Sequence, residues 1–200
     1  MNKNLFISVL IFVSLTSCIS VNTKYKAIEN DFCFQANDSV LVTAFIGDLA
    51  KEKFMEDQIV EYFRNSGFSQ FYSLKEYDPF GKFWDDGNEE KRQNLYEKLG
   101  TQYLLIVGLT NYGVRSKYIP EKEQTTISIY GNSIYANKNT YGGYTVAVPD
   151  MEFDVIINNG REQIGLLKIE TGVSWFGWLA SEEQIYKKTA KQVFTAFNGN

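Results

Sequence analysis

The sequence lacks histidine altogether. This absence excludes Ser-His-Asp and Cys-His catalysis, zinc sites with histidine ligands and imidazole pH switches. The chain also has no Gly-x-Gly-x-x-Gly or Gly-Lys-Ser phosphate loop, and no Ser-x-x-Lys motif of penicillin-recognising enzymes. Because these motifs are missing, we expect no cofactor and no nucleotide substrate.

An excess of positive charge is also missing. The chain has 20 Lys and Arg residues against 24 Asp and Glu, a net charge of −4. Nucleic acid is therefore not an expected partner, because phosphate binding needs a basic face. Cysteine is scarce, with only Cys18 and Cys33. Cys33 lies between Phe32 and Phe34 and is predicted to be a small buried apolar residue.

Long apolar runs are absent too, since the stretch over residues 5–13 is shorter than the ~20 residues of a membrane-spanning helix. Lys3 precedes this stretch, and Leu15-Thr16-Ser17-Cys18 follows it. A cationic start, a short apolar region and small residues are typical of a secretory signal. The alternatives are an uncleaved transmembrane anchor, or an ordinary signal peptide followed by an incidental cysteine.

The four residues ending at Cys18 resemble the lipobox of bacterial lipoproteins. This resemblance implies that residues 1–17 are a signal peptide, removed when the Cys18 thiol is acylated, with palmitate among the attached chains. We therefore predict a lipid-anchored protein of the cell envelope, at the outer membrane and facing the periplasm. Two or three acyl chains give a stable membrane anchor.

After this anchor, the composition predicts one globular domain. Residues 18–38 are mixed and polar and are predicted to form a tether, and residues 39–200 the domain. Within it, apolar runs and helical spacing predict elements in the following order: strand 39–46, helix 51–65, strand 68–74, helix 89–99 and strand 103–109. The strands 39–46 and 103–109 are apolar enough to be buried on both faces.

The polar segment 115–144 is rich in Tyr, Asn, Gly and Thr and is predicted to be an insertion, with a small hairpin over 127–135. Residues 151–169 then alternate as a second hairpin, with one face on helices and one in water. Ser181-Glu182-Glu183-Gln184 matches a capping box and begins a last helix. The predicted fold class is a single α/β (α+β) domain in which three helices cover a mixed sheet of about five strands, in the order β-α-β-α-β-(insertion)-β-β-α.

Two segments carry a resemblance to known envelope domains. Residues 99–108 (LGTQYLLIVG) combine a helix end, a turn and an apolar strand ending in glycine, and residues 166–172 (LLKIETG) form a late strand with a Thr-Gly turn. Over residues 39–197 the order of elements is similar to the amino-terminal domain of TolB, to the curli-secretion lipoproteins and to lipoproteins that activate cell-wall synthases. The resemblance implies a small periplasmic α/β domain.

Candidate sites are weighed against ordinary structural roles. The acidic cluster 85–90 lacks the spacing of a calcium loop and fits a helix start, so no metal site is predicted. One interpretation of the aromatic run before the last helix is that it closes the core, yet Trp favours interfaces and makes it the best candidate for partner binding. The insertion is predicted to be an exposed recognition loop, so its tyrosines are further candidates for partner binding. The candidate partner-binding residues are Trp175, Phe176, Trp178, Tyr130, Tyr135 and Tyr141.

These observations predict a lipoprotein that is not an enzyme. Its expected partners are membrane lipid, through acylated Cys18, and an unidentified envelope protein that it helps to assemble. One alternative is a subunit of a secretion channel of the curli type, whose insertions cross the membrane as hairpins, although segment 115–144 has little apolar alternation. The other is an envelope glycan enzyme that uses paired Asp or Glu residues.

Overall fold

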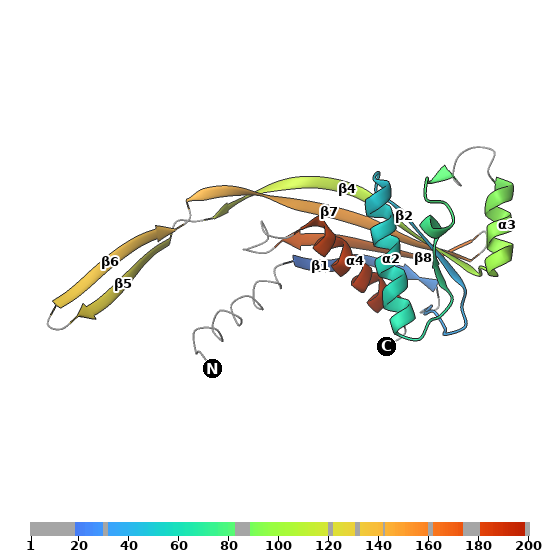
Figure 1. Cartoon of the computed structure of the whole chain (residues 1–200), viewed down its shortest axis with the longest axis horizontal. Coiled ribbons are helices and arrows are strands. Elements are labelled where there is room, and N and C mark those ends of the chain that lie inside the picture. The colour runs from blue at the N-terminus through green and yellow to red at the C-terminus, as the bar shows by residue number, and fades with distance from the viewer. Residues whose placement is uncertain are drawn as a thin grey trace.

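A six-stranded mixed β-sheet forms the centre of the computed structural model, which describes residues 19–29, 32–82, 89–119, 122–130, 133–141, 143–159, 162–173 and 181–198. The strands lie side by side in the order β1-β8-β7-β4-β2-β3 (Figure 1). β2 pairs in parallel with β3 and β4, whereas β4, β7, β8 and β1 pair antiparallel. Their bounds are β1 (Ile19–Ile28), β2 (Val40–Phe45), β3 (Phe71–Ser73), β4 (Tyr103–Ile119), β7 (Tyr144–Asn159) and β8 (Glu162–Val173).

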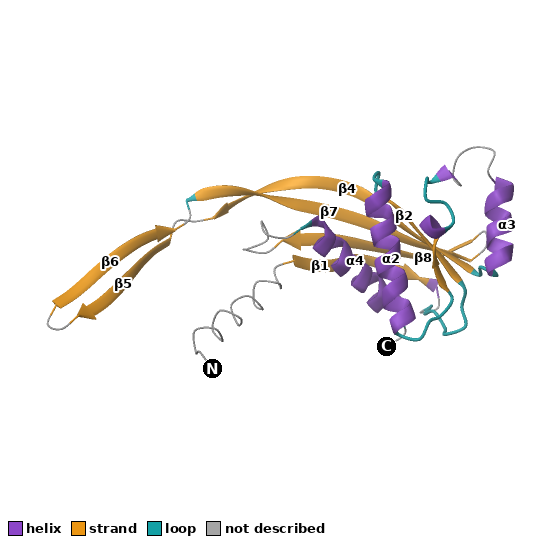
Figure 2. Ribbon diagram, in the orientation of Figure 1, coloured by secondary structure: helices purple, strands orange, loops and turns teal. Residues whose placement is uncertain are grey.

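Helices α2 (Leu49–Asn65) and α4 (Glu182–Phe197) cover one face of this sheet (Figure 2). Each begins at a side-chain cap. The Asp48 carboxylate accepts from the first turn of α2, and the Ser181 hydroxyl accepts from the N–H of Gln184, as the predicted capping box requires. Fully buried aromatic side chains fill the layer between helices and sheet, namely Phe63, Phe71, Phe153 and Phe197.

Among the described elements, α3 (Glu89–Leu99) covers one end of the opposite face, where its Leu95 packs with Leu41 and with Leu74 of the short 3-10 helix η2 (Leu74–Glu76). Over β7, β8 and β1 this face carries charged side chains beside half-buried Ile156 and Leu166, and Lys24 makes ion pairs with Glu152 and Glu170. The prediction that hairpin 151–169 presents one face to helices and the other to water is therefore confirmed.

The predicted fold class, a single α/β domain with three helices, is confirmed, but the sheet has six strands rather than about five. The additional strand is β1, so the tether predicted over 18–38 is wrong for residues 19–28. Phe34 is also only 2% exposed, and Cys33 beside it is half-buried rather than buried. β1 is an edge strand with mostly exposed side chains, which is why its sequence shows little apolar periodicity.

Burial on both faces was predicted for strands 39–46 and 103–109, and the structure confirms it only for the first. β2 is buried on both faces as predicted. In β4, Leu105 and Val107 are fully buried under the helices, whereas Leu104 and Ile106 on the other face are only half-buried. The strand predicted over 68–74 is confined to Phe71–Ser73, and β4 continues ten residues beyond the predicted end at 109.

β4 and β7 continue past the sheet as a two-stranded ribbon, from Tyr112 opposite Met151 to Ile119 opposite Tyr144. At its end, β5 (Lys122–Tyr130) and β6 (Ser133–Tyr141) pair as a separate hairpin that points away from the helices (Figure 1). We call residues 110–151 the arm. The arm contains the predicted insertion at 115–144, and the hairpin predicted over 127–135 extends in both directions.

A β-bulge at Thr110 marks the junction between the sheet and the arm. The register steps from Leu109 opposite Phe153 to Asn111 opposite Glu152, which leaves Thr110 without a partner position. Before the bulge the odd-numbered residues of β4 face the helices, as buried Leu105 does. After the bulge the even-numbered residues lie on that side, beginning with Tyr112, because its partner Met151 is in the core.

Candidate functional site at the base of the arm

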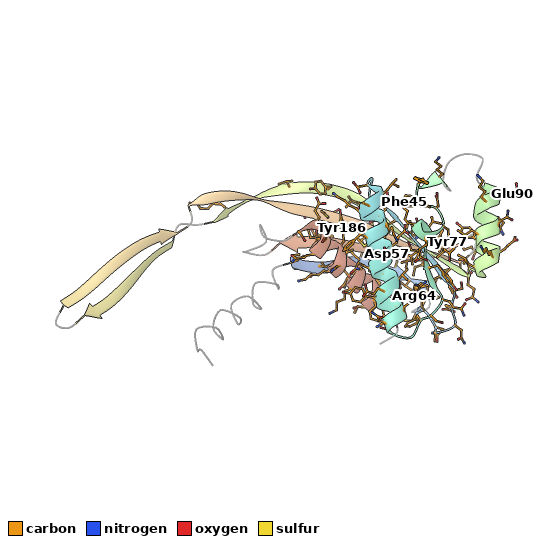
Figure 3. The ribbon with its side chains drawn as sticks, in the orientation of Figure 1. Phe45, Asp57, Arg64, Tyr77, Glu90 and Tyr186 are labelled. Carbon is orange, nitrogen blue, oxygen red and sulfur yellow. The ribbon has the colours of Figure 1, made fainter. Side chains whose placement is uncertain are left out.

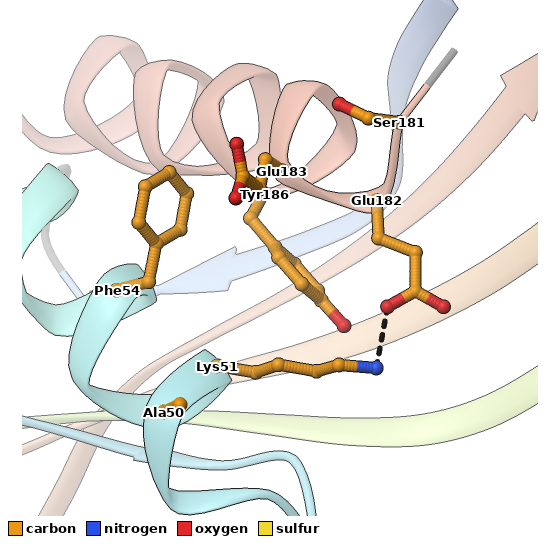
Figure 4. A pocket seen from close by; sticks show the side chains of 7 residues that line it. All are labelled: Ala50, Lys51, Phe54, Ser181, Glu182, Glu183 and Tyr186. Atoms are coloured by element: carbon orange, nitrogen blue, oxygen red, sulfur yellow. Dashed lines mark ion pairs between the residues drawn. The ribbon is translucent and has the colours of Figure 1, made fainter. Parts of the chain in front are cut away.

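A groove lies between the first turns of α2 and α4, beside the base of the arm (Figure 4). Lys51 enters it from α2 and Glu182 from α4, with Phe54 and Tyr186 one turn further along their helices. The space is about 360 Å³. We call it the helix groove. Tyr186 lies on the side of α2 from which the arm projects (Figure 3).

Two opposite charges of the helix groove are paired with each other. Lys51 forms an ion pair with Glu182, and the Tyr112 hydroxyl of the arm donates to Glu182 Oε1 at 3.1 Å. The hydrogen bond to Glu182 raises the pKa of both Lys51 and Tyr112, and burial raises the pKa of Tyr186. Both tyrosine hydroxyls are therefore protonated near neutral pH, and that of Tyr112 donates to Glu182.

On the helix side of the arm, Tyr112, Val114 and Tyr118 occupy even positions of β4, with Ser116 between the last two. Their exposed fractions are 54%, 60% and 60%. We call them the arm strip. The strip begins next to the helix groove and runs outward, where neither edge of the ribbon pairs with another strand of the described chain. Exposed tyrosine and valine in a row are typical of a protein-binding surface.

A buried polar network closes the carboxyl ends of the parallel strands. The Glu56 carboxylate accepts from Ala44 N, Ser73 Oγ and Lys75 N at 2.9, 2.7 and 2.8 Å. Burial raises the pKa of Glu56, against the effect of these hydrogen bonds. The neighbouring Glu52 is paired with Lys75 Nζ at 2.8 Å.

Ligands of open α/β sheets usually bind at the carboxyl ends of the strands. Here, Glu52 also accepts from the backbone N–H groups of Ile46 and Gly47, each at 3.1 Å. Burial of Glu52 acts to raise its pKa, but the bonds from Lys75 and from these two N–H groups outweigh it, so the pKa is lowered. The polar groups at this edge therefore bind one another and fasten α2 to β2 and η2.

A second groove adjoins the helix groove at Ala50 and Phe54 of α2 and opens towards the 74–82 segment. Leu49, Phe54 and Pro79 form its apolar walls, Lys53 and Asp57 its polar rim, and its space is about 450 Å³. We call it the loop groove. Leu49 is 46% exposed and Phe80, which follows Pro79, is 72% exposed.

This architecture is similar to that of PelC. A dodecameric PelC variant with one substitution, from Paraburkholderia phytofirmans, superimposes with a TM-score of 0.50 at 8% sequence identity, over 91% of this chain and 99% of PelC. A second PelC dodecamer structure from the same organism gives a TM-score of 0.49 at 9% identity, over the same shares. Protein-family models and characterised sequences give no match. The likeness to PelC shows the fold, while the resemblances to TolB and the curli lipoproteins stay predictions.

The predicted site residues fall in two groups. Cys18 and the aromatic residues Trp175, Phe176 and Trp178 lie outside the described residues. Tyr130, Tyr135 and Tyr141 are positions of β5 and β6, and the register places all three on one face of that hairpin, opposite Ser133, Ser128 and Lys122. Ser181, which directly follows the aromatic segment, borders the helix groove.

The arm strip and the loop groove were not predicted. Tyr112 and Val114 lie beyond the predicted end of strand 103–109, and the bulge at Thr110 breaks the alternation that would have revealed one face. Within the described residues, no three acidic or cysteine side chains come close enough to hold a metal ion. The helices of the same residues are all too short or too polar to cross a membrane.

Proposed function

We propose that this chain is a lipid-anchored envelope lipoprotein that works by binding, as a self-assembling subunit of an envelope complex. The observation that carries the proposal is the bare arm. An isolated two-stranded ribbon is marginally stable in water, and its open edges and apolar strip favour association. PelC, which shares the fold, is a dodecamer. In such an oligomer, other copies would cover the open edges and the apolar strip of the arm.

The start of β1 supports anchoring through Cys18. Ile19, the first residue of β1, pairs with Val173 at the end of β8, and Lys188 Nζ on α4 donates to the Ile19 carbonyl at 2.7 Å. An acyl group on Cys18 would therefore be one residue away from the sheet. In this proposal the domain is held directly at the membrane, at the outer membrane and on its periplasmic side.

The aromatic segment belongs to the same proposal. It follows Val173, the residue paired with Ile19, so the chain runs from the anchored corner of the sheet into Trp175, Phe176 and Trp178. Trp residues favour the interface between membrane and water. We propose that these three residues contact lipid headgroups, and that Tyr130, Tyr135 and Tyr141 contact a protein partner.

The proposed role is binding rather than catalysis. A glycosidase needs two carboxyl groups facing each other across a cleft. In the helix groove Glu182 is already engaged by Lys51 and Tyr112, and at the carboxyl ends of the strands Glu52 and Glu56 are sealed in the core. These contacts favour structural roles for the acids.

A secretion-channel subunit is the second candidate, because β5 and β6 have nine residues each, the lower limit for a membrane-crossing strand. Against it, the register gives only one short apolar face, at positions Ile127, Ile129, Ile134 and Ala136. Vesicles loaded with a dye distinguish the two candidates. Release of the dye by the purified protein would favour the channel, and retention would favour an assembly subunit.

The experiment for the main proposal uses the full chain expressed in a Gram-negative host. We expect the protein to partition into detergent and to elute from size-exclusion chromatography with light scattering as an oligomer. Cys18→Ala should move it to the aqueous phase, whereas the matched control Cys33→Ala should still partition into detergent. Equal partition of the two variants would refute the anchor, and a monomeric wild type would refute self-assembly.

A further inference from the structure

Two separate apolar surfaces on this chain suggest how copies meet. The arm strip (Tyr112, Val114 and Tyr118) projects as one row of side chains along the ribbon, and the loop groove is a depression walled by Leu49 and Pro79 with Phe80 beside it. One surface is raised and the other hollow. Both are exposed in the described chain, and neither is covered by another described element.

The arm strip begins beside α4, whereas the loop groove lies between α2 and the segment that carries Lys75 and Pro79. The arm points away from the helices (Figure 1). Because of this direction, an arm cannot lie back on its own groove without a reversal of the ribbon. A second copy, placed beside the first, can supply the missing surface to each.

Their chemistry is complementary. Tyrosine side chains combine a large apolar ring with a hydroxyl group, and they are enriched at interfaces. The loop groove offers the apolar walls of Leu49, Phe54 and Pro79 for the rings, and Lys53 and Asp57 at the rim for the hydroxyls (Figure 3 labels Asp57). Its space of about 450 Å³ admits one or two such side chains.

We propose that the arm strip of one copy docks in the loop groove of the next copy. This inference rests on the proposed self-assembly and names its interface. Because the two surfaces differ, the contact is head-to-tail, and such contacts repeat from copy to copy until they close a ring or form a filament. Each copy then covers its neighbour's arm, which removes the exposed apolar strip from water.

The test blocks each surface separately in the full chain. Tyr118→Lys places a charge on the arm strip, and Phe80→Lys places one beside the loop groove. Both side chains are exposed, so the fold should be kept, which circular dichroism and thermal melting verify. The matched control is Tyr25→Lys, a tyrosine of β1 that is 52% exposed and lies outside both surfaces.

Light scattering in detergent gives the mass of each species. We expect the wild type and Tyr25→Lys to be oligomers, and each blocked variant to be a monomer. An equal mixture of the two blocked variants should form a dimer and nothing larger, because one intact arm strip and one intact loop groove remain. Where a variant fails to fold, Val114→Lys or Leu49→Lys replaces it on the same surface.

The outcomes separate this inference from the proposed function. A monomeric wild type refutes self-assembly itself. If the wild type and both blocked variants are all oligomers, the proposed interface is wrong but self-assembly is not. A groove variant that stays oligomeric while the arm variant dissociates would indicate contact between two arms, and a mixture that stays monomeric would show that strip and groove are not partners. Either result overturns the inference.

Discussion

The two halves of β4 differ in almost everything except their strand conformation. Residues 103–109 are apolar, pair on both edges and lie under α2 and α4. Residues 112–119 mix polar and apolar side chains, pair only with β7 and expose Tyr112, Val114 and Tyr118. The same strand is therefore a core element at one end and an open ribbon at the other. Pairing with a neighbour gives both halves the strand conformation, but only the inner half is also stabilised by burial.

The largest expected difference compares the same substitution at two points of this strand. Leu105→Asp places a charge in the closed core and should destabilise the fold by about 4 kcal/mol or more. Val114→Asp on the arm strip, 60% exposed, should cost less than about 1 kcal/mol. Urea unfolding followed by circular dichroism measures both. Similar losses would mean that the arm is as tightly packed as the sheet with its helices, which we call the body.

A smaller effect is expected from the buried ion pair of the body. Glu52→Gln leaves the Lys75 ammonium group without its charge partner and should cost about 3 kcal/mol near pH 7. Asp57→Asn, in an exposed pair with Lys53 on the same helix, should cost less than about 0.5 kcal/mol. Equal losses from urea unfolding would contradict the burial of the first pair.

The stability lost in Glu52→Gln should depend on pH, and the sign of this dependence is defined. The pKa of Glu52 in the folded chain lies below its ordinary value of 4.5, so its stabilising effect is complete above that pH. It is lost as the pH falls through the lowered pKa, because the carboxyl group then takes up a proton. The stability difference between wild type and Glu52→Gln should shrink on acidification. A constant difference would show that Glu52 is not bound as a carboxylate.

Glu56 tests whether the body needs an acceptor at both carboxylate oxygens. In Glu56→Gln an NH₂ group faces a backbone N–H or the Ser73 hydroxyl, and the lost bond should cost about 2 kcal/mol. Glu61→Gln on the exposed face of α2 is the control and should be neutral. The melting temperatures of the two variants measure the difference, and a fully stable Glu56→Gln would contradict the network.

The smallest effect concerns the link between body and arm. Glu182→Gln weakens the partly exposed pair with Lys51 and the bond from Tyr112, and should cost only about 0.5 kcal/mol overall. Its local effect should be clearer, since amide hydrogen exchange at the base of the arm should accelerate while Leu105 and Val107 stay protected. Unchanged exchange at Tyr112 would show that Glu182 does not hold the arm.

Burial explains which elements were predictable from sequence. Strand 39–46, the helices and hairpin 151–169 bury an apolar face, so their periodicity is visible in the sequence. β1 and the outer half of β4 expose most of their described side chains, and a residue such as Asn22 tells nothing about its pairing with Glu170 of the distant β8. Their conformation depends on partners far along the chain, which a local pattern does not contain.

The candidate site follows the same rule. The helix groove is built by Lys51 and Glu182, and the loop groove by Leu49 and Pro79, residues that only the packing of separate elements brings together. Sequence patterns identified Ser181 as the start of α4, because a cap is a local feature. They could not identify the arm strip, whose alternation is hidden by one unpaired residue, Thr110.

The bulge at Thr110 affects two properties of the arm: the direction in which it projects, and which of its side chains face the helices. Suppose that Thr110 instead paired with Glu152, so that the register slipped by one. Asn111, Gly113, Arg115 and Lys117 would then take the side now occupied by Tyr112 and Val114. Deleting Thr110 would keep Tyr112 opposite Met151 but remove the bend and extra twist of the bulge. The residue of β4 that lies opposite Met151, rather than the length of the junction, therefore selects whether the row with Tyr112 or the more polar row with Asn111 faces the helices.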